Sequence, residues 1–133
     1  MALILIVEDE PQVRVLMESF LQEQGHKTLS AGTEKEALAL LADSRVDIMF
    51  TDVILHDDIH AGLTLAQEAV EQHPGLRVLY TTGQDVTDGI KALFVENSAF
   101  LPKPYTAEQV QTVLQVSFGA GFGSEAPARE AAK

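Results

Sequence analysis

The sequence of 133 residues contains no cysteine. This absence excludes a disulfide framework, thiol catalysis and any zinc site that uses sulfur ligands. It says little about the cellular compartment, and the cytoplasm is the default expectation. A chain of this length fits one domain, with a core that buries roughly two-thirds of the surface of the unfolded chain.

Long apolar segments are also lacking. No run approaches the roughly eighteen apolar residues that a membrane span requires. The first residues, MALILIVEDE, have neither the basic start nor the long apolar stretch of a signal peptide. We therefore expect a soluble protein.

Positive charge is scarce: 9 Lys and Arg residues stand against 20 Asp and Glu residues, and the formal net charge is -11. This charge repels nucleic-acid phosphates and anionic lipids, so we expect neither direct DNA binding nor membrane binding. Cations and basic protein surfaces are the more natural partners. Solubility alone explains the acidity of the whole chain equally well.

Five short and mainly apolar segments have the length and composition of strands, and the first is apolar enough to be buried on both faces of a sheet. They are residues 2–7, 27–31, 46–51, 76–82 and 99–101. Because segments of helical period alternate with them, the sequence predicts an α/β fold with a doubly wound parallel sheet, right-handed crossovers and helices on both faces.

Local signals mark where the five helices begin and end. Pro11 suits the first turn of a helix, and Gly25 is well placed to end that helix. Thr33 and Glu36 have the spacing of a capping box. The third helix is expected around residues 63–70, the fourth over residues 85–97, and the last begins at Thr106 with Glu108 nearby.

Two parts of the chain have weak helical or folding signals. Gly89 lies inside the predicted fourth helix and costs about 1 kcal/mol relative to alanine. Residues 118–133 are rich in Gly and Ala, so we expect a disordered tail there, with Phe118 and Phe122 beyond the last helix. The folded domain is predicted to comprise residues 1–117.

A residue able to take part in phosphoryl chemistry follows or ends four of the apolar segments. These residues are Asp9, Asp52, Thr82 and Lys103. In doubly wound parallel sheets, ligands bind beyond the carboxyl ends of the strands. We therefore expect the four side chains to converge at one edge of the sheet.

The motifs ILIVEDE, VDIMFTDVIL, VLYTTG and FLPKPY occur in this order along the chain. Together they resemble the receiver domain of bacterial two-component response regulators, the CheY-like family. The resemblance covers residues 2–117 and implies a flavodoxin-like fold of five strands in the order 2-1-3-4-5 with five helices. One such motif is weak evidence, whereas four at matching strand ends are specific.

The resemblance implies that Asp52 is the phosphoacceptor, whose carboxylate attacks a phosphohistidine to give an acyl phosphate. It also implies a metal site in which Asp9 and Asp52 are direct ligands, Glu8 acts through water and Ile54 supplies its backbone carbonyl. Clustered carboxylates favour a hard divalent cation, Mg²⁺ first and Mn²⁺ second. Glu10 is interpreted as an acid at the helix start.

Lys103 matches the lysine of the family and is expected to pair with Asp52 at rest and with a phosphoryl oxygen afterwards. The alternative is an ordinary surface lysine. In the family the bond between this lysine and the following proline, here Pro104, is often cis, and the sequence does not decide its isomer.

Thr82 matches the switch hydroxyl, which can donate to the phosphoryl oxygen. Gly83 takes the place of the small residue that leaves the phosphoryl group accessible, and Gln84 lies where relatives tune hydrolysis. Phe100 matches the aromatic switch partner, where many relatives have tyrosine. Because phenylalanine has no hydroxyl, an altered coupling and a plain core position are both open.

The loop LHDDIHAG departs from the family pattern, because His56 stands where many relatives have proline and the loop is longer. His56, Asp57, Asp58 and His60 are ligand types that suit a transition metal. A solvated loop is the favoured interpretation. The loop is also a candidate for controlling access of the kinase or of water to Asp52.

The resemblance predicts a single-domain response regulator that is phosphorylated by a sensor histidine kinase and is not an enzyme in its own right. It signals by altered docking, through the fourth helix, fifth strand and fifth helix, or by passing the phosphoryl group to a phosphotransfer protein. A phosphate sink, a phosphorylation-independent docking module and a homodimer through the same face stay open. A metal-dependent phosphatase is disfavoured because Ile54 stands where its second acid belongs, and a nucleotide binder because acids follow the first strand.

Overall fold

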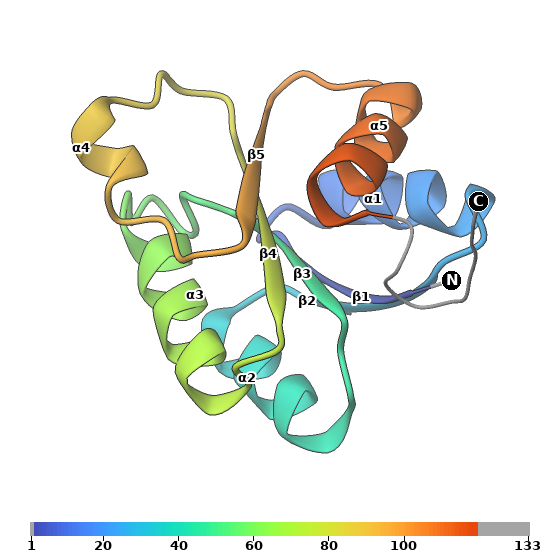
Figure 1. Cartoon of the computed structure of the whole chain (residues 1–133), viewed down its shortest axis with the longest axis horizontal. Helices are drawn as coiled ribbons and strands as arrows, with labels where there is room; N and C mark the ends of the chain where they lie inside the picture. The colour runs from blue at the N-terminus through green and yellow to red at the C-terminus, as the bar shows by residue number, and fades with distance from the viewer. Residues whose placement is uncertain (1, 120–133) are drawn as a thin grey trace.

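The computed structural model describes residues 2–119 (Figure 1). The part of the predicted tail from residue 120 onward, including Phe122, lies outside the described residues. Strands and helices alternate along the chain as predicted. The elements are β1 Leu3–Val7, α1 Pro11–Glu23, β2 Lys27–Ala31, α2 Glu34–Asp43, β3 Ile48–Asp52, α3 Ala61–Gln72, β4 Arg77–Thr82, α4 Asp88–Lys91, β5 Ser98–Pro102 and α5 Ala107–Phe118.

The five strands form one parallel sheet in the order β2-β1-β3-β4-β5, which confirms the predicted topology. Helices α1 and α5 lie together on one face, and α2 and α3 lie on the other (Figure 1). The chain winds in opposite directions from β1, toward β2 and toward β3. The carboxyl ends of the central strands therefore open onto a shared edge, where such folds bind ligands.

Two apolar cores fill the space between the sheet and its two helix layers. Met17 and Leu21 of α1 and Val110 and Leu114 of α5 pack against Phe50 and its neighbours on one face. Leu41 of α2 and several apolar side chains of α3 pack on the other face. All residues of β3 are buried, so the strand that carries Asp52 is enclosed on both sides.

Helices α2 and α5 begin at the predicted capping residues, but some of the hydrogen-bond partners there differ from those expected. Thr33 accepts a hydrogen bond from the Glu36 N–H at 3.1 Å, but the Glu36 carboxylate accepts from the Gly32 N–H at 2.7 Å and does not bond Thr33. At α5, Thr106 forms a full capping box with Gln109. The Gln109 side chain, and not that of the neighbouring Glu108, therefore satisfies the Thr106 N–H.

The fourth helix was predicted too long. The structure contains one helical turn, Asp88–Lys91, where the sequence indicated residues 85–97. Thr87 caps this turn by accepting from the Ile90 N–H at 3.2 Å. Beyond this turn the Leu93 and Phe94 N–H groups bond carbonyls three residues back, at 3.0 and 3.1 Å, and the Val95 N–H donates to the Tyr80 hydroxyl, so the α-helical bonding pattern does not continue.

The last helix extends one residue further than predicted. Phe118 ends α5, is buried in the core on the α1 and α5 face, and accepts a hydrogen bond at its carbonyl from Arg77 Nη1 at 3.1 Å. Phe118 is thus part of the folded domain and not of a tail. Within the described residues 2–119, no helix is both long enough and apolar enough to cross a membrane.

Candidate functional site

The carboxyl edge of the sheet brings the four predicted residues to one depression of about 380 Å³. Asp9 follows β1, Asp52 ends β3, Thr82 ends β4 and Lys103 follows β5. The remaining lining residues are Glu8, Glu10, Ile54, Asp57, Gly83 and Gln84. Topology therefore places side chains that are far apart in the sequence around a single solvent-accessible space.

Three carboxylates form the floor of this depression. Oxygen atoms of Glu8, Asp9 and Asp52 lie within 4.8 Å of one another. Lys103 Nζ lies 2.6 Å from Asp52 Oδ2 and 3.1 Å from Glu8 Oε1. The cluster thus contains three carboxylates and one ammonium, which contacts two of them, and every potential metal ligand atom among the acids is an oxygen. That donor set fits a hard divalent cation such as Mg²⁺.

Burial sets the protonation of the innermost acid. The Glu8 side chain is 1% exposed. Burial, helped by the neighbouring Asp52 carboxylate, raises the pKa of Glu8 to about 7. The Glu10 N–H, which donates to Glu8 Oε2 at 3.1 Å, and the Lys103 charge oppose this rise in pKa. Crowding of buried carboxylates is thus only partly relieved by the lysine.

Lys103 and Asp9 are held in their ionised forms. Burial alone would lower the pKa of Lys103, but the Asp52 and Glu8 carboxylates raise it above the usual value. Burial alone would raise the pKa of Asp9, yet the hydrogen bond from the His56 backbone N–H lowers it. The cluster therefore keeps a permanent cation beside Asp52 and an ionised acid at its rim.

Asp52 is positioned by its backbone neighbours. The Ile54 N–H donates to Asp52 Oδ1 at 3.3 Å, and the Val53 N–H donates to the Thr81 carbonyl at 2.9 Å. The Gly62 N–H donates to the Val53 carbonyl at 2.9 Å, which brings the start of α3 against the end of β3. These bonds fix the direction in which the Asp52 carboxylate leaves the sheet.

Thr82, and not Thr81, lines the depression. Thr82 Oγ1 accepts a hydrogen bond from the Gln84 N–H at 3.3 Å, and the Thr82 carbonyl accepts from the Lys103 N–H at 3.0 Å. Thr81 is fully buried in the sheet, and its hydroxyl is without a partner among the described residues. The Lys103–Pro104 bond is cis.

Phe100 belongs to a row of three aromatic side chains, with Tyr80 and Phe94. The Tyr80 and Phe94 rings stack with centroids 4.1 Å apart, and Phe94 and Phe100 lie 6.0 Å apart. The Tyr80 hydroxyl accepts from the Val95 N–H at 3.1 Å. Tyr80 and Phe94 were missed in the sequence, although a tyrosine in a buried strand signals a hydroxyl that needs a partner.

Replacing Tyr80 by phenylalanine keeps the ring stack and removes the hydroxyl. We expect Tyr80→Phe to lower the free energy of unfolding by about 1 kcal/mol, because the partly buried Val95 N–H loses its acceptor. The Val95 amide should also exchange with solvent faster, as measured by NMR hydrogen exchange. Tyr105→Phe is the control, and equal Val95 exchange in both variants would contradict the assigned bond.

The loop between β3 and α3 does not form the transition-metal set that the sequence left open. Among residues 2–119, the group of acidic and histidine side chains close enough to hold a metal is Glu8, Asp9 and Asp52. Of the four loop residues considered, only Asp57 lines the depression. The loop instead forms a tight turn, in which Leu55 and Asp58 pair.

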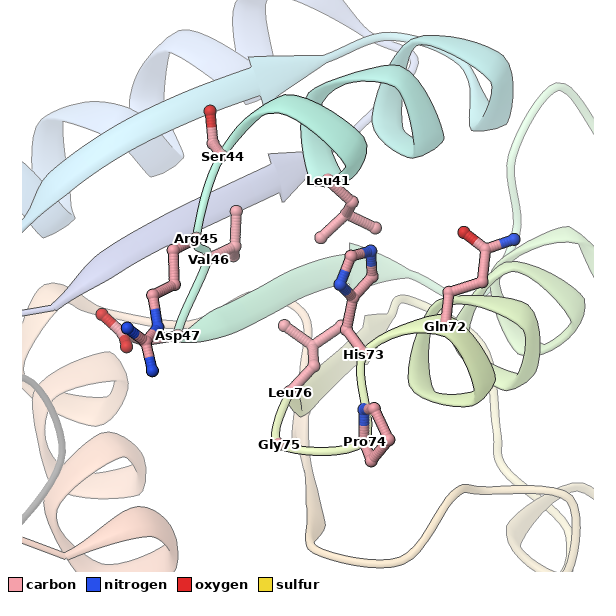
Figure 2. Close-up of a pocket in the computed structure, with 10 residues that line it drawn as sticks. All are labelled: Leu41, Ser44, Arg45, Val46, Asp47, Gln72, His73, Pro74, Gly75 and Leu76. Carbon is pink, nitrogen blue, oxygen red and sulfur yellow. The ribbon is translucent and has the colours of Figure 1, made fainter.

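Figure 2 shows a second cavity, of about 390 Å³. It opens where α2 and α3 end, at the amino-terminal edge of β3 and β4. None of the predicted site residues lines it. Its lining residues are Leu41, Ser44, Arg45, Val46, Asp47, Gln72, His73, Pro74, Gly75 and Leu76.

Solved structures with similar folds include response regulator receiver and chemotaxis proteins. The receiver protein from Sinorhizobium medicae matches with a TM-score of 0.78 at 24% identity, covering 90% of this chain and 95% of that chain. The chemotaxis protein CheY4 from Vibrio cholerae matches with a TM-score of 0.77 at 24% identity, covering 88% and 98%. These likenesses establish the fold.

Sequence relatives include larger regulators. The chain is 32% identical over 108 residues to the probable transcriptional regulatory protein TcrX from Mycobacterium tuberculosis, covering 80% of this chain and 45% of TcrX. It is 40% identical over 101 residues to the response regulator protein PilR from Pseudomonas aeruginosa, covering 75% and 22%. The chain thus spans less than half the length of these two relatives.

A family model described as the response regulator receiver domain matches residues 4–115. This range contains β1 to β5 in nearly full length and every residue that lines the acidic depression. The chain therefore belongs to the response regulator receiver domain family.

Proposed function

We propose that this receiver domain accepts a phosphoryl group on Asp52 from a sensor histidine kinase in a reaction that requires Mg²⁺. The observation that carries the proposal is the contact between Lys103 Nζ and Asp52 Oδ2, 2.6 Å apart, at the floor of a depression lined by Glu8 and Asp9. A structural aspartate in a sheet does not need an open space, a neighbouring pair of acids and a fixed cation around it.

The transfer is a displacement at phosphorus. An Asp52 carboxylate oxygen attacks the phosphohistidine of the kinase, an O–P bond forms, the P–N bond breaks, and the imidazole leaves with the electron pair of that bond. The product on Asp52 is an acyl phosphate. Because charge spreads over the equatorial phosphoryl oxygens, positioning and neutralisation dominate catalysis of such transfers.

The residues present fit a divalent cation. Asp9 and Asp52 are proposed as direct ligands, Glu8 as a ligand through water, and the Ile54 carbonyl as a third protein oxygen, since all four residues line the depression. When bound, Mg²⁺ neutralises phosphoryl charge during the transfer, and Mn²⁺ can substitute for it. Lys103 holds its ammonium on Asp52 and is placed to contact a phosphoryl oxygen.

The output is proposed as a shift between two arrangements of the α4, β5 and α5 face. Thr82 Oγ1 now accepts from the Gln84 N–H and would instead donate to a phosphoryl oxygen. Phe100 is the proposed aromatic partner, within the row formed by Tyr80 and Phe94. Gly83 is proposed to leave room beside the phosphoryl group, since it lines the depression with no side chain, and a Cβ added there would lie 3.9 Å from Lys103 Cβ.

The proposed partners are a sensor histidine kinase and either a downstream docking protein or a phosphotransfer protein, and we place the domain itself in the cytoplasm. The same transfer to Asp52 would also let the domain act as a sink that drains phosphoryl groups from the kinase. A homodimer through the α4, β5 and α5 face is compatible with either role. A net charge of -11 argues against DNA as a direct ligand of this domain. The chemistry is the same whether the domain acts alone, as the sequence suggested, or within a longer regulator.

The proposal is tested by incubating the protein with acetyl phosphate and Mg²⁺ and separating the products by phosphate-affinity electrophoresis. Wild type should give a retarded band, which Asp52→Asn and removal of Mg²⁺ by EDTA should each abolish. Asp58→Asn is the matched control, since Asp58 lies in the neighbouring loop outside the depression. An unshifted wild-type band, under conditions that phosphorylate a known receiver, would overturn the proposal.

A further inference from the structure

His56 begins a turn of unusual backbone conformation beside the acidic depression. Leu55 and Asp58 exchange two backbone hydrogen bonds, and the two residues between them, His56 and Asp57, have φ values of 51° and 64°. Positive φ is unfavourable for residues with a side chain and persists only where other contacts hold the backbone. The hydrogen bonds of His56 to other parts of the fold are therefore candidates for the contacts that hold this turn.

Two hydrogen bonds of His56 join three loops at the carboxyl edge of the sheet. Its backbone N–H donates to Asp9 Oδ2 at 3.0 Å, and its ring Nε2 lies 2.9 Å from the Gly32 carbonyl oxygen. His56 Nδ1 is 3.9 Å from the same Asp9 oxygen. Because a carbonyl oxygen can only accept a hydrogen bond, Nε2 must carry the hydrogen and donate it to the Gly32 oxygen.

The anchor point at Gly32 is itself held on both sides. The Gly32 N–H donates to Glu36 Oε1 at 2.7 Å, in the first turn of α2. A Cβ on Gly32 would lie 2.8 Å from Arg14 Nη1, which donates to the Glu8 carbonyl at 2.7 Å. The His56 ring is therefore attached to a fixed part of the fold and not to a free loop.

We propose that His56 is a positioning residue for the metal site: its ring bond to Gly32 fixes the turn, and the fixed turn orients the Asp9 carboxylate through the backbone N–H. The inference rests on the proposed Mg²⁺ site and deepens it. Hydrogen bonds to metal-ligating carboxylates hold the ligand in its binding orientation, and their loss weakens metal affinity. Proline at residue 56 could play no such part, because it has no N–H and its φ is fixed near -65°.

Two substitutions separate the ring bond from the backbone bond. Both His56→Asn and His56→Gln keep the backbone N–H. The asparagine amide reaches only as far as Nδ1 and cannot bond Gly32, although asparagine tolerates positive φ well. The glutamine amide nitrogen reaches about as far as Nε2 and can donate to the same carbonyl. The His56 side chain is 53% exposed, so neither change disturbs the core.

Mg²⁺ binding is measured by isothermal titration calorimetry, and phosphorylation by acetyl phosphate is measured against Mg²⁺ concentration. We expect His56→Asn to raise the Mg²⁺ dissociation constant about tenfold, at the low end of such effects. The phosphorylation rate at saturating Mg²⁺ should stay unchanged, because Asp52 and Lys103 are intact. His56→Gln should restore affinity to within about twofold of wild type. His60→Asn, in the same loop, is the control and should match wild type.

Equal Mg²⁺ affinity in His56→Asn and wild type would overturn the proposal, and so would an equal loss in both His56 variants or an absence of Mg²⁺ binding to wild type. The calorimetric result stands apart from phosphorylation. If wild type binds Mg²⁺, the His56 variants behave as described, and Asp52 is not phosphorylated, then the positioning role is supported and the proposed function fails.

Discussion

Replacing Gly62 by alanine is expected to lower the free energy of unfolding by about 3 kcal/mol and to impair phosphorylation of Asp52. Gly62 lies in the first turn of α3, where it is buried against the end of β3. A Cβ at this position would overlap the carbonyl oxygen of Asp52 and would lie 2.8 Å from Val53 Cα. These are backbone atoms, so no side-chain rotation can relieve the overlap.

The Gly62→Ala protein can respond in only two ways. Either α3 moves away from the sheet and loses the 2.9 Å bond from the Gly62 N–H to Val53, or the peptide of Asp52 rotates and turns the carboxylate away from Lys103. The first response costs packing of buried α3 side chains, and the second costs the geometry of the site. Chemical denaturation and the acetyl phosphate assay measure the two effects separately.

Gly89→Ala is the matched control for this substitution. The nearest atom to a Cβ on Gly89 is Thr87 Oγ1, at 3.8 Å, which is an ordinary contact. Because alanine has the higher helix propensity, Gly89→Ala should leave stability unchanged or raise it by up to about 1 kcal/mol. If the Gly62→Ala variant had the same denaturant midpoint of unfolding as wild type, the close packing of α3 on Asp52 would be contradicted.

Replacing Lys103 by alanine is expected to slow phosphorylation by acetyl phosphate about 100-fold, even at saturating Mg²⁺. The ammonium contacts Asp52 at 2.6 Å and is the fixed positive charge nearest the reacting carboxylate among the described residues. Removing one preorganised group that stabilises transition-state charge typically costs between 100- and 1000-fold in rate. The measurement is the initial rate of acyl phosphate formation.

Mg²⁺ binding should survive this substitution. The proposed ligands are oxygens of Glu8, Asp9, Asp52 and Ile54, and removing a nearby positive charge does not weaken a cation site. Lys91→Ala is the control, since Lys91 lies on α4 outside the depression. A wild-type rate in Lys103→Ala would show that the lysine serves only to balance charge in the resting protein.

Much of the fold was predictable because its strands are short and differ sharply from their surroundings. Residues 2–7 are uniformly apolar, so a sheet covered on both faces was the prediction, and the structure buries β3 along its whole length. The alternation of strands with helical segments predicted that the strands are parallel. Because the carboxyl ends of parallel strands share one edge of a sheet, the sequence also predicted where Asp9, Asp52, Thr82 and Lys103 meet.

The misjudged elements depend on contacts between residues far apart in the sequence. Residues 85–97 have helical character, but only Asp88–Lys91 forms a helical turn, and the Val95 N–H further along donates to the Tyr80 hydroxyl of β4 and not to a helix carbonyl. Glu36 bonds Gly32 and not Thr33, although its sequence spacing suits either. Phe118 could be assigned to the core only from its burial against the α1 and α5 face of the sheet, which no local sequence signal indicates.

Within the site, the sequence indicated which residues gather but not how they interact. The contact of Lys103 with Glu8 as well as Asp52, and the rise of the Glu8 pKa to about 7, follow from burial that a linear pattern does not contain. The turn at His56 was visible only as a departure from the family pattern. Its bonds to Asp9 and Gly32 required the three-dimensional structure.

The most direct test of the account locates the phosphoryl group itself. Protein treated with acetyl phosphate and Mg²⁺ is reduced with borohydride, which converts an aspartyl phosphate to homoserine and releases phosphate, and the peptides are sequenced by mass spectrometry. We expect homoserine at residue 52 and unmodified aspartate at residues 9 and 57. Homoserine at residue 9 or 57, or unmodified aspartate at residue 52 in protein that acetyl phosphate has phosphorylated, would contradict the assignment of Asp52 as the phosphoacceptor.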